Sequence, residues 1–340
     1  MNRSVLYVAA LGLLLGGVIE ARAGQFNGTL FFTTFSGSGN DRLHDVKYTY
    51  DSSVPSLTLS SVNDIITNQS IGADGLIFAP DGKTLIVGGQ GPIYHVDPSN
   101  GHVLQTLTTG GVTVYHIALS PDGNTVYGGG SEGGSAGLAV VPTNPYANGT
   151  TKTVTGSNSI ITGVAFDGQG NGFYTSSGVN GGGNFGTLTG LPNAPVTKAL
   201  ITNLTAAHGI TYDPFTGDFI LVGGNQIAQV DTSGKILSTR LFSNFNSVFD
   251  QASVDGQGHL FVANNDGNVL FVDYSQSGLV GDLSDFTSKN FLANFLDDTA
   301  PLAGLGSQTP EPATVALLAI GIAGMAGYGW RGRKQQDARH

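Results

Sequence analysis

"ADGLIFAPDGKTLIVGG", residues 73–89, is the stretch that decides the fold. A short apolar run leads into the turn sequence Ala-Pro-Asp-Gly, and a second apolar run follows the turn. Proline, aspartate and glycine supply the backbone angles of tight turns, so the stretch predicts two β-strands joined as a hairpin. The same pattern returns four times, at residues 115–130, 162–178, 208–224 and 250–267.

These repeats are regularly spaced. Their aligned first positions are 74, 115, 162, 208 and 250, which gives steps of 41, 47, 46 and 42 residues. In three repeats a third apolar run follows and ends in Val-Asp before a turn: residues 92–101, 225–234 and 267–275. A period near 40–50 residues with several short strands per unit is typical of the blades of a β-propeller.

Two further fragments complete one more blade. Residues 30–37 and 46–53 resemble later strands of a blade that lacks its first strand, whereas residues 296–306 resemble a first strand with nothing after it. Asp298 lies 48 residues beyond Asp250, which fits the period. Strands from the two ends of the repeat region would therefore close the ring.

We predict an all-β chain in which residues 24–307 form a six-bladed β-propeller. A seven-bladed ring would require an extra unit hidden in residues 144–204. Short strands with frequent turns are also found in β-sandwiches and β-helices, which are less consistent with the period.

The composition indicates a folded chain and excludes several functions. The 340 residues include 52 glycines and only 11% charged residues, but 40% are hydrophobic, which is enough to bury a core. A net charge of −10 with only 14 Lys and Arg excludes a nucleic-acid-binding surface. The chain has no cysteine, so disulfides and thiolate chemistry are excluded.

The first residues have the parts of a secretory signal peptide, which we assign to residues 1–23. A basic residue near the start precedes an apolar run at residues 5–19, and the small residues Ala21 and Ala23 form the pattern that signal peptidase accepts. We expect cleavage before Gly24. An uncleaved membrane anchor is disfavoured because the apolar run is short for a bilayer.

A second apolar segment lies near the C-terminus, at residues 313–330. Its 18 residues are close to the minimum that crosses a hydrocarbon core as a helix, so we predict a transmembrane helix. Arg331, Arg333 and Lys334 follow at once. Because positive charge favours the cytoplasmic side, the bulk of the chain is expected to face outward.

Pro310, Glu311 and Pro312 stand directly before this segment. Pro-Glu-Pro, an apolar helix and a basic tail, in this order at residues 308–340, resemble the PEP-CTERM sorting signal of Gram-negative bacteria. The resemblance implies transient anchoring in the inner membrane facing the periplasm, processing by an exosortase, and a final place at the cell surface or outside the cell. Members of this family are typical of bacteria that make exopolysaccharide or biofilm matrix. The Asp-Gly and Pro-Asp-Gly turns of the repeats are in addition similar to those of YVTN-type surface propellers.

The first strand of each propeller blade lines the central channel, where side chains from all blades converge. The aligned positions are Asp74, Tyr115, Thr162, His208, Asp250 and Asp298, with His116 replacing Tyr115 if that strand slips by one residue. Close carboxylates repel one another unless a cation neutralises them. The candidate metal ligands are therefore Asp74, His208, Asp250 and Asp298. Oxygen ligands favour Ca²⁺ or Mg²⁺, the imidazole leaves Mn²⁺ and Zn²⁺ open, and a polar, water-filled channel without metal is the alternative.

The function that these features favour is non-catalytic: a surface or matrix protein that binds a glycan, another protein or itself. The expected partners are signal peptidase and the exosortase during export, then exopolysaccharide or other matrix proteins, and not nucleic acid. The alternative is a metal-dependent extracellular hydrolase similar to the lactonase propellers. Their metal sites use a glutamate with Asn and Asp, and no glutamate stands at the aligned inner positions here. A Gly-x-Ser-x-Gly match at residues 129–133 lacks the strand-to-helix turn that a nucleophile elbow needs.

Overall fold

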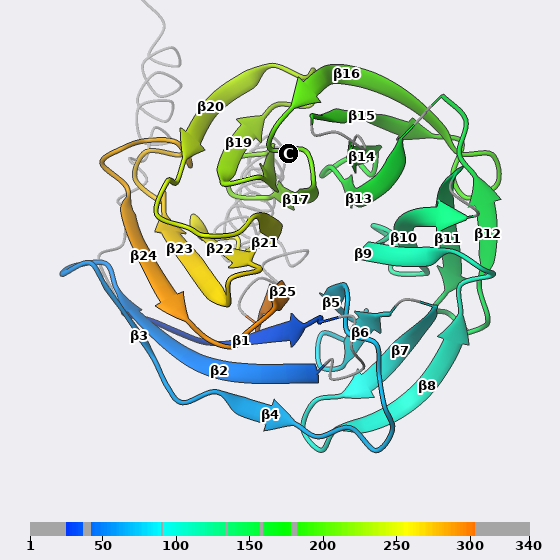
Figure 1. Cartoon of the computed structure of the whole chain (residues 1–340), viewed down its shortest axis with the longest axis horizontal. Helices are drawn as coiled ribbons and strands as arrows, with labels where there is room; N and C mark the ends of the chain where they lie inside the picture. The colour runs from blue at the N-terminus through cyan, green and yellow to red at the C-terminus, as the bar shows by residue number, and fades with distance from the viewer. Residues whose placement is uncertain are drawn as a thin grey trace, which may run out of the picture.

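The computed structural model describes residues 25–36, 42–89, 91–132, 135–156, 159–177 and 182–302. These residues form six antiparallel sheets arranged in a ring (Figure 1). The innermost strands contact one another around the axis in the order β5, β9, β13, β17, β21 and β25, and β25 returns to β5. The six-bladed propeller is thus confirmed, and the described ranges hold no seventh sheet.

Five blades consist of four consecutive strands each, which run from the axis outward. They are β5 (Leu76–Phe78), β6 (Leu85–Gly88), β7 (Pro92–Asp97) and β8 (His102–Thr108); β9 (Thr113–Leu119), β10 (Thr125–Glu132), β11 (Ser135–Pro142) and β12 (Thr150–Thr153); β13 (Ile160–Phe166), β14 (Gly172–Ser177), β15 (Gly183–Thr189) and β16 (Val196–Leu204); β17 (Gly209–Asp213), β18 (Asp218–Gly223), β19 (Gln226–Val230) and β20 (Ile236–Leu241); and β21 (Phe249–Val254), β22 (His259–Asn264), β23 (Asn268–Asp273) and β24 (Phe286–Phe291). The predicted hairpins and third strands are among them.

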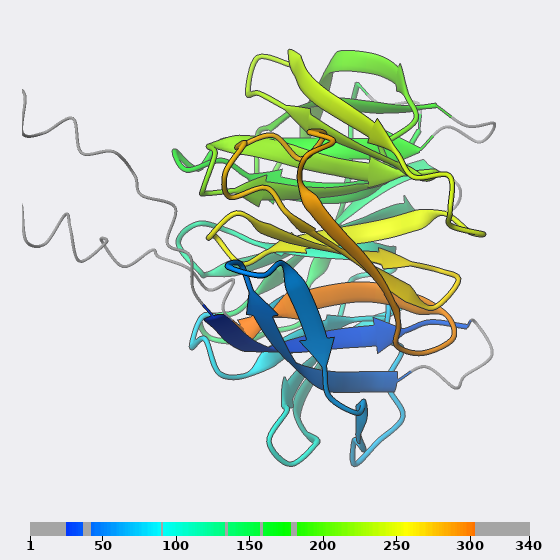
Figure 2. The same cartoon turned by 90° about the vertical axis from the view of Figure 1, so that its left-hand side faces the viewer.

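The sixth blade combines both ends of the propeller. Its inner strand is β25 (Leu296–Pro301), followed outward by β1 (Gln25–Thr34), β2 (Arg42–Asp51) and an outer edge in two pieces, β3 (Ser56–Leu59) and β4 (Asn63–Ile65). β25 pairs antiparallel with β1, and the two strands lie side by side in Figure 2. The predicted closure by strands from both ends is therefore confirmed.

Hydrogen bonds explain the aspartate that recurs in the hairpin turns. Asp81 Oδ1 accepts the backbone N–H groups of Lys83, at 2.8 Å, and Thr84, at 2.9 Å. Equivalent bonds hold the turns at Asp122, Asp167 and Asp255. A short side chain that bonds to the backbone two residues later is a turn-forming device, so these aspartates serve the fold.

The hydrophobic core is divided among the blades. Six clusters of buried side chains each lie between two adjacent blades. The cluster at the closure joins Leu30 and Phe32 of β1 and Leu296 of β25 to Phe261 of β22 and Phe271 of β23. Because the apolar clusters are buried between blades, the core does not need apolar side chains at the axis, and polar side chains can lie there.

Within the described residues there is no helix long and apolar enough to cross a membrane. The predicted signal peptide, residues 1–23, and the predicted transmembrane helix, residues 313–330, lie outside the described residues, as does the rest of the sorting signal.

Candidate functional site

Polar side chains meet at the axis near the start of the innermost strands. They are Asp74 just before β5, His116 in β9, His208 just before β17, Asp250 in β21, and Asp297 and Asp298 in β25. All except His208 are buried. The side chains at this level form what we call the channel cluster.

His116 crosses the channel. Its Nε2 lies 3.4 Å from Asp250 Oδ1, and its Nδ1 lies 3.2 Å from Asp298 Oδ1. The blade of β9 and the blade of β21 stand opposite each other in the ring (Figure 1), so the contact with Asp250 spans the axis. These side chains therefore close the channel at this level.

His208 approaches the same carboxylate from the side. Its Nε2 lies 2.9 Å from Asp250 Oδ1, and its ring meets that of His116 edge to face, with 5.2 Å between the ring centroids. The His208 side chain is 30% exposed, which makes it the solvent-facing member of the cluster. Thr162 and Thr175 donate hydroxyl hydrogen bonds to the backbone carbonyl of His208, at 2.8 and 2.7 Å, and so hold its backbone in place.

Burial and ion pairing oppose each other here. Burial alone would lower the pKa of His116, but the charge of Asp298 and polar contacts with Asp250 and Asp298 raise that pKa well above its usual value. Burial alone would raise the pKa of Asp250, but the two imidazoles hold it well below its usual range. At both residues the attraction between imidazole and carboxylate therefore outweighs the effect of burial.

Asp297 is a further carboxyl of the cluster that the sequence-based prediction did not include. Burial, followed by the charges of Asp250, Asp74 and Asp298, raises the pKa of Asp297 well above its usual value. A hydrogen bond with Asp250 shifts the pKa of Asp297 in the same direction. Burial likewise raises the pKa of Asp298, although His116 opposes the shift.

Irregular pairing explains which side chains reach the axis. The inner strands change register against their neighbours at Tyr115–His116, Thr162, Asp250–Gln251 and Asp297–Asp298. A β-bulge places two residues opposite one and re-aims the side chains. In β9 the buried member of the pair is His116, and Tyr115 is half-buried, so the one-residue slip is the arrangement observed.

The four predicted metal ligands all lie in the channel cluster, but the ligand atoms that come close together are not those of the predicted set. One ligand atom each of His116, His208 and Asp250 lies within 4.8 Å of the other two. Asp298 contacts the far nitrogen of His116 instead, and Asp74 is a buried neighbour whose charge acts on Asp297. His116 is the one residue of these three that is absent from the predicted ligands. Its signal in the sequence was its place next to Tyr115.

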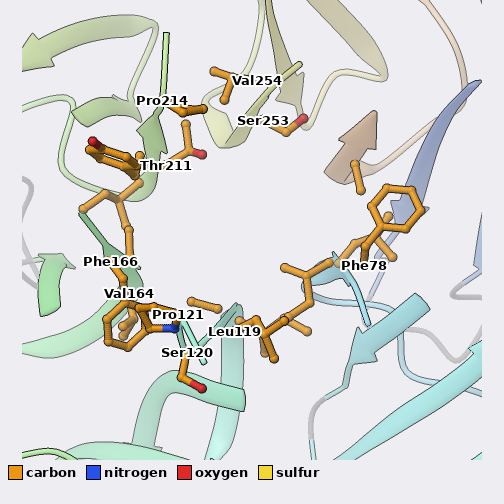
Figure 3. A pocket seen from close by; sticks show the side chains of 18 of the residues that line it. Phe78, Leu119, Ser120, Pro121, Val164, Phe166, Thr211, Pro214, Ser253 and Val254 are labelled. Atoms are coloured by element: carbon orange, nitrogen blue, oxygen red, sulfur yellow. The ribbon is translucent and has the colours of Figure 1, made fainter. Parts of the chain in front are cut away.

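The other end of the channel widens into a cavity of about 1000 Å³ (Figure 3). All six inner strands line it, together with the turns after β5, β9, β13 and β17. The lining combines apolar side chains with hydroxyls and one amide, including Leu119, Phe166, Thr211, Gln251 and Ser253. Among the described residues that line the cavity, none is a histidine, lysine, arginine or glutamate.

The C-terminal segment can be assigned by comparison. Residues 308–334 match the PEP-CTERM protein-sorting motif. The PEP-CTERM motif indicates an exported protein that is anchored transiently in the membrane and processed by an exosortase. No curated protein sequence matches the chain.

Several solved structures are similar to the propeller. A chain of the nidogen/laminin complex has 12% identity and a TM-score of 0.59, covering 82% of this chain and 99% of that one. TolB from Acinetobacter baumannii has 14% identity and a TM-score of 0.56, covering 87% and 71%. The periplasmic gluconolactonase of Pseudomonas aeruginosa has 14% identity and a TM-score of 0.50, covering 81% and 99%. At these identities the likeness concerns the fold alone.

Proposed function

We propose that this exported PEP-CTERM protein is a non-catalytic binding propeller of the cell surface or extracellular matrix, and that its wide cavity takes a segment of uncharged exopolysaccharide. The signal peptide would be removed before Gly24, and the exosortase would then release the propeller from the inner membrane. The observation that carries the proposal is the contrast between the two ends of the channel. The titratable cluster is buried except for the partly exposed His208, whereas the cavity is open and lacks histidine, lysine, arginine and glutamate among its described lining residues.

The chemistry of the lining favours a sugar chain. Sugar rings present apolar C–H faces that pack on side chains such as Leu119 and Phe166, and hydroxyls that bond to Thr211, Gln251 and Ser253. A cavity of this volume, which combines apolar surface with polar groups, has the character of a ligand site.

The charge of the cavity supports an uncharged ligand. Asp81, Asp122 and Asp167 stand among its lining residues, and the chain has a net charge of −10. The hydrogen bonds of their turns favour the charged forms of Asp81 and Asp122, whose pKa values lie below the usual value although burial opposes the shift at Asp81. A polyanion would be repelled by these carboxylates.

The experiment is a binding isotherm of the exported protein on exopolysaccharide purified from the producing cells. Ser253→Trp should fill the cavity and weaken binding by at least tenfold, because the indole occupies the space of the ligand. Ser61→Trp introduces the same side chain at an exposed position and should bind as the unchanged protein does. Melting temperatures establish that both variants are folded, and Gln251→Ala, which removes one polar group, should give a smaller loss.

Equal binding by the two tryptophan variants would overturn the cavity as the site. A metal-dependent hydrolase is the competing function, and it predicts turnover of a lactone or sugar ester that a chelator abolishes. Such turnover by the unchanged protein would overturn the non-catalytic assignment.

A further inference from the structure

Three potential ligand atoms converge at the channel cluster. His116 Nε2 and His208 Nε2 lie 3.4 and 2.9 Å from the same oxygen, Asp250 Oδ1, and one ligand atom of each residue lies within 4.8 Å of the others. Bonds of about 2.0–2.2 Å to a tetrahedral ion separate its ligand atoms by roughly 3.4 Å. The distance from His116 Nε2 to Asp250 Oδ1 already has this value. The distance from His208 Nε2 to Asp250 Oδ1 would have to increase by about half an ångström.

One of these atoms is left without a hydrogen bond. His116 Nε2 is inaccessible to solvent and has no hydrogen-bond partner, and its side chain is only 2% exposed. A buried ring nitrogen in this state has a free-energy cost unless another group satisfies it. The ligand atom Asp250 Oδ1 lies 3.4 Å from His116 Nε2.

The far side of the same ring is held as in metal sites. Asp298 lies 3.2 Å from His116 Nδ1, and its carboxylate is 1% exposed. A carboxylate at the far nitrogen fixes the ring orientation and the tautomer, which leaves the Nε2 lone pair free for a metal. Thr162 and Thr175 hold the backbone of His208, so both imidazoles are positioned by their surroundings.

We propose that His116, His208 and Asp250 bind one Zn²⁺ ion through the two Nε2 atoms and Oδ1, at the end of the channel opposite the cavity. Two imidazoles with one carboxylate suit Zn²⁺, whereas Ca²⁺ takes about six to eight oxygen ligands. Three protein ligands would leave the fourth position of a tetrahedral Zn²⁺ ion to water, and the partly exposed His208 side chain is the ligand that solvent reaches. The ion would join three blades, those of β9, β17 and β21, across the axis.

The competing arrangement contains protons in place of the metal. In it, His116 is an imidazolium held between Asp250 and Asp298, and these two carboxylates need no metal ion. Metal binding would release a proton from this imidazolium, so Zn²⁺ and protons compete for the same nitrogen. The two arrangements therefore differ in metal content and in the proton release that accompanies titration.

The test uses the whole exported protein, stripped with a chelator and titrated with ZnCl₂ by calorimetry, with bound metal measured by mass spectrometry. We expect one Zn²⁺ per chain, proton release on binding, a higher melting temperature than in chelator, and no displacement by millimolar Ca²⁺. His208→Gln removes the solvent-facing ligand and should weaken Zn²⁺ binding at least tenfold. Asp298→Asn should weaken it by about 10–100-fold, as the loss of an orienting partner does.

His102→Gln is the matched control, because His102 is exposed on β8, the outermost strand of its blade. It should bind Zn²⁺ as the unchanged protein does. Absence of stoichiometric Zn²⁺ binding, equal binding by the His208 and His102 variants, or preferential binding of Ca²⁺ would each overturn the proposal in favour of the proton-held cluster.

Discussion

Leu296 offers a quantitative test of the ring closure. It opens β25, is 0% exposed, and packs with Leu30 and Phe32 of β1 and with Phe261 of β22. Leu296→Ala removes buried methyl groups and leaves a cavity between two blades, a change that costs about 2–5 kcal/mol. In a large domain each kcal/mol lowers the melting temperature by roughly 2–4 °C. The variant should therefore melt at least about 4 °C below the unchanged protein.

Leu283 provides the control for the same chemical change, because its side chain is 83% exposed. Leu283→Ala should change stability by less than about 0.5 kcal/mol. Both variants are compared by urea unfolding followed by circular dichroism, and by thermal melts. If Leu296→Ala unfolded at the same urea concentration as Leu283→Ala, the C-terminal strand would not be part of the core, and closure by both ends would be wrong.

Two further predictions follow from single positions. A Cβ at Gly88 would lie 2.3 Å from the backbone oxygen of Asp74, so Gly88→Ala should destabilise the protein by about 1–3 kcal/mol. Gly91→Ala is the control: no atom lies within 4 Å of its Cβ, so the same unfolding assay should show no loss of stability. Burial raises the pKa of Asp285 to about 6, so its ionisation lowers stability as the pH rises from about 4 to 6. Asp285→Asn should therefore raise the free energy of unfolding at pH 7 by about 1 kcal/mol, after allowance for solvent screening, and leave it unchanged at pH 3. A gain of equal size at both pH values would show that the ionisation of Asp285 is not the cause.

The fold could be predicted from the sequence because its determinants are local. Each hairpin is marked by an aspartate such as Asp81 that bonds to its own turn, and the repeats carry the same alternation of apolar runs. The closure was predictable for the same reason: Asp298 falls at the expected interval after Asp250, although it pairs with a strand from the other end of the chain.

The channel cluster was only partly predictable because bulges determine it. A bulge depends on how two strands pair, which the sequence of one strand does not reveal. The position of His116 at the axis, instead of Tyr115, and the burial of both Asp297 and Asp298 follow from such irregularities. The wide cavity at the other end has no sequence signal of its own, since the strand and turn residues that line it are those that the repeats would carry in any case.

The central claim, that the cavity is the binding surface of this exported propeller, is tested most directly by amide hydrogen exchange with and without the exopolysaccharide of the producing cells. The account predicts slower exchange in the segments around the cavity, residues 79–82, 120–123, 164–168 and 211–214, with the outer strands β8, β12 and β16 unchanged. Slower exchange confined to the outer strands, or no change at the cavity under conditions where binding is saturated, would contradict it.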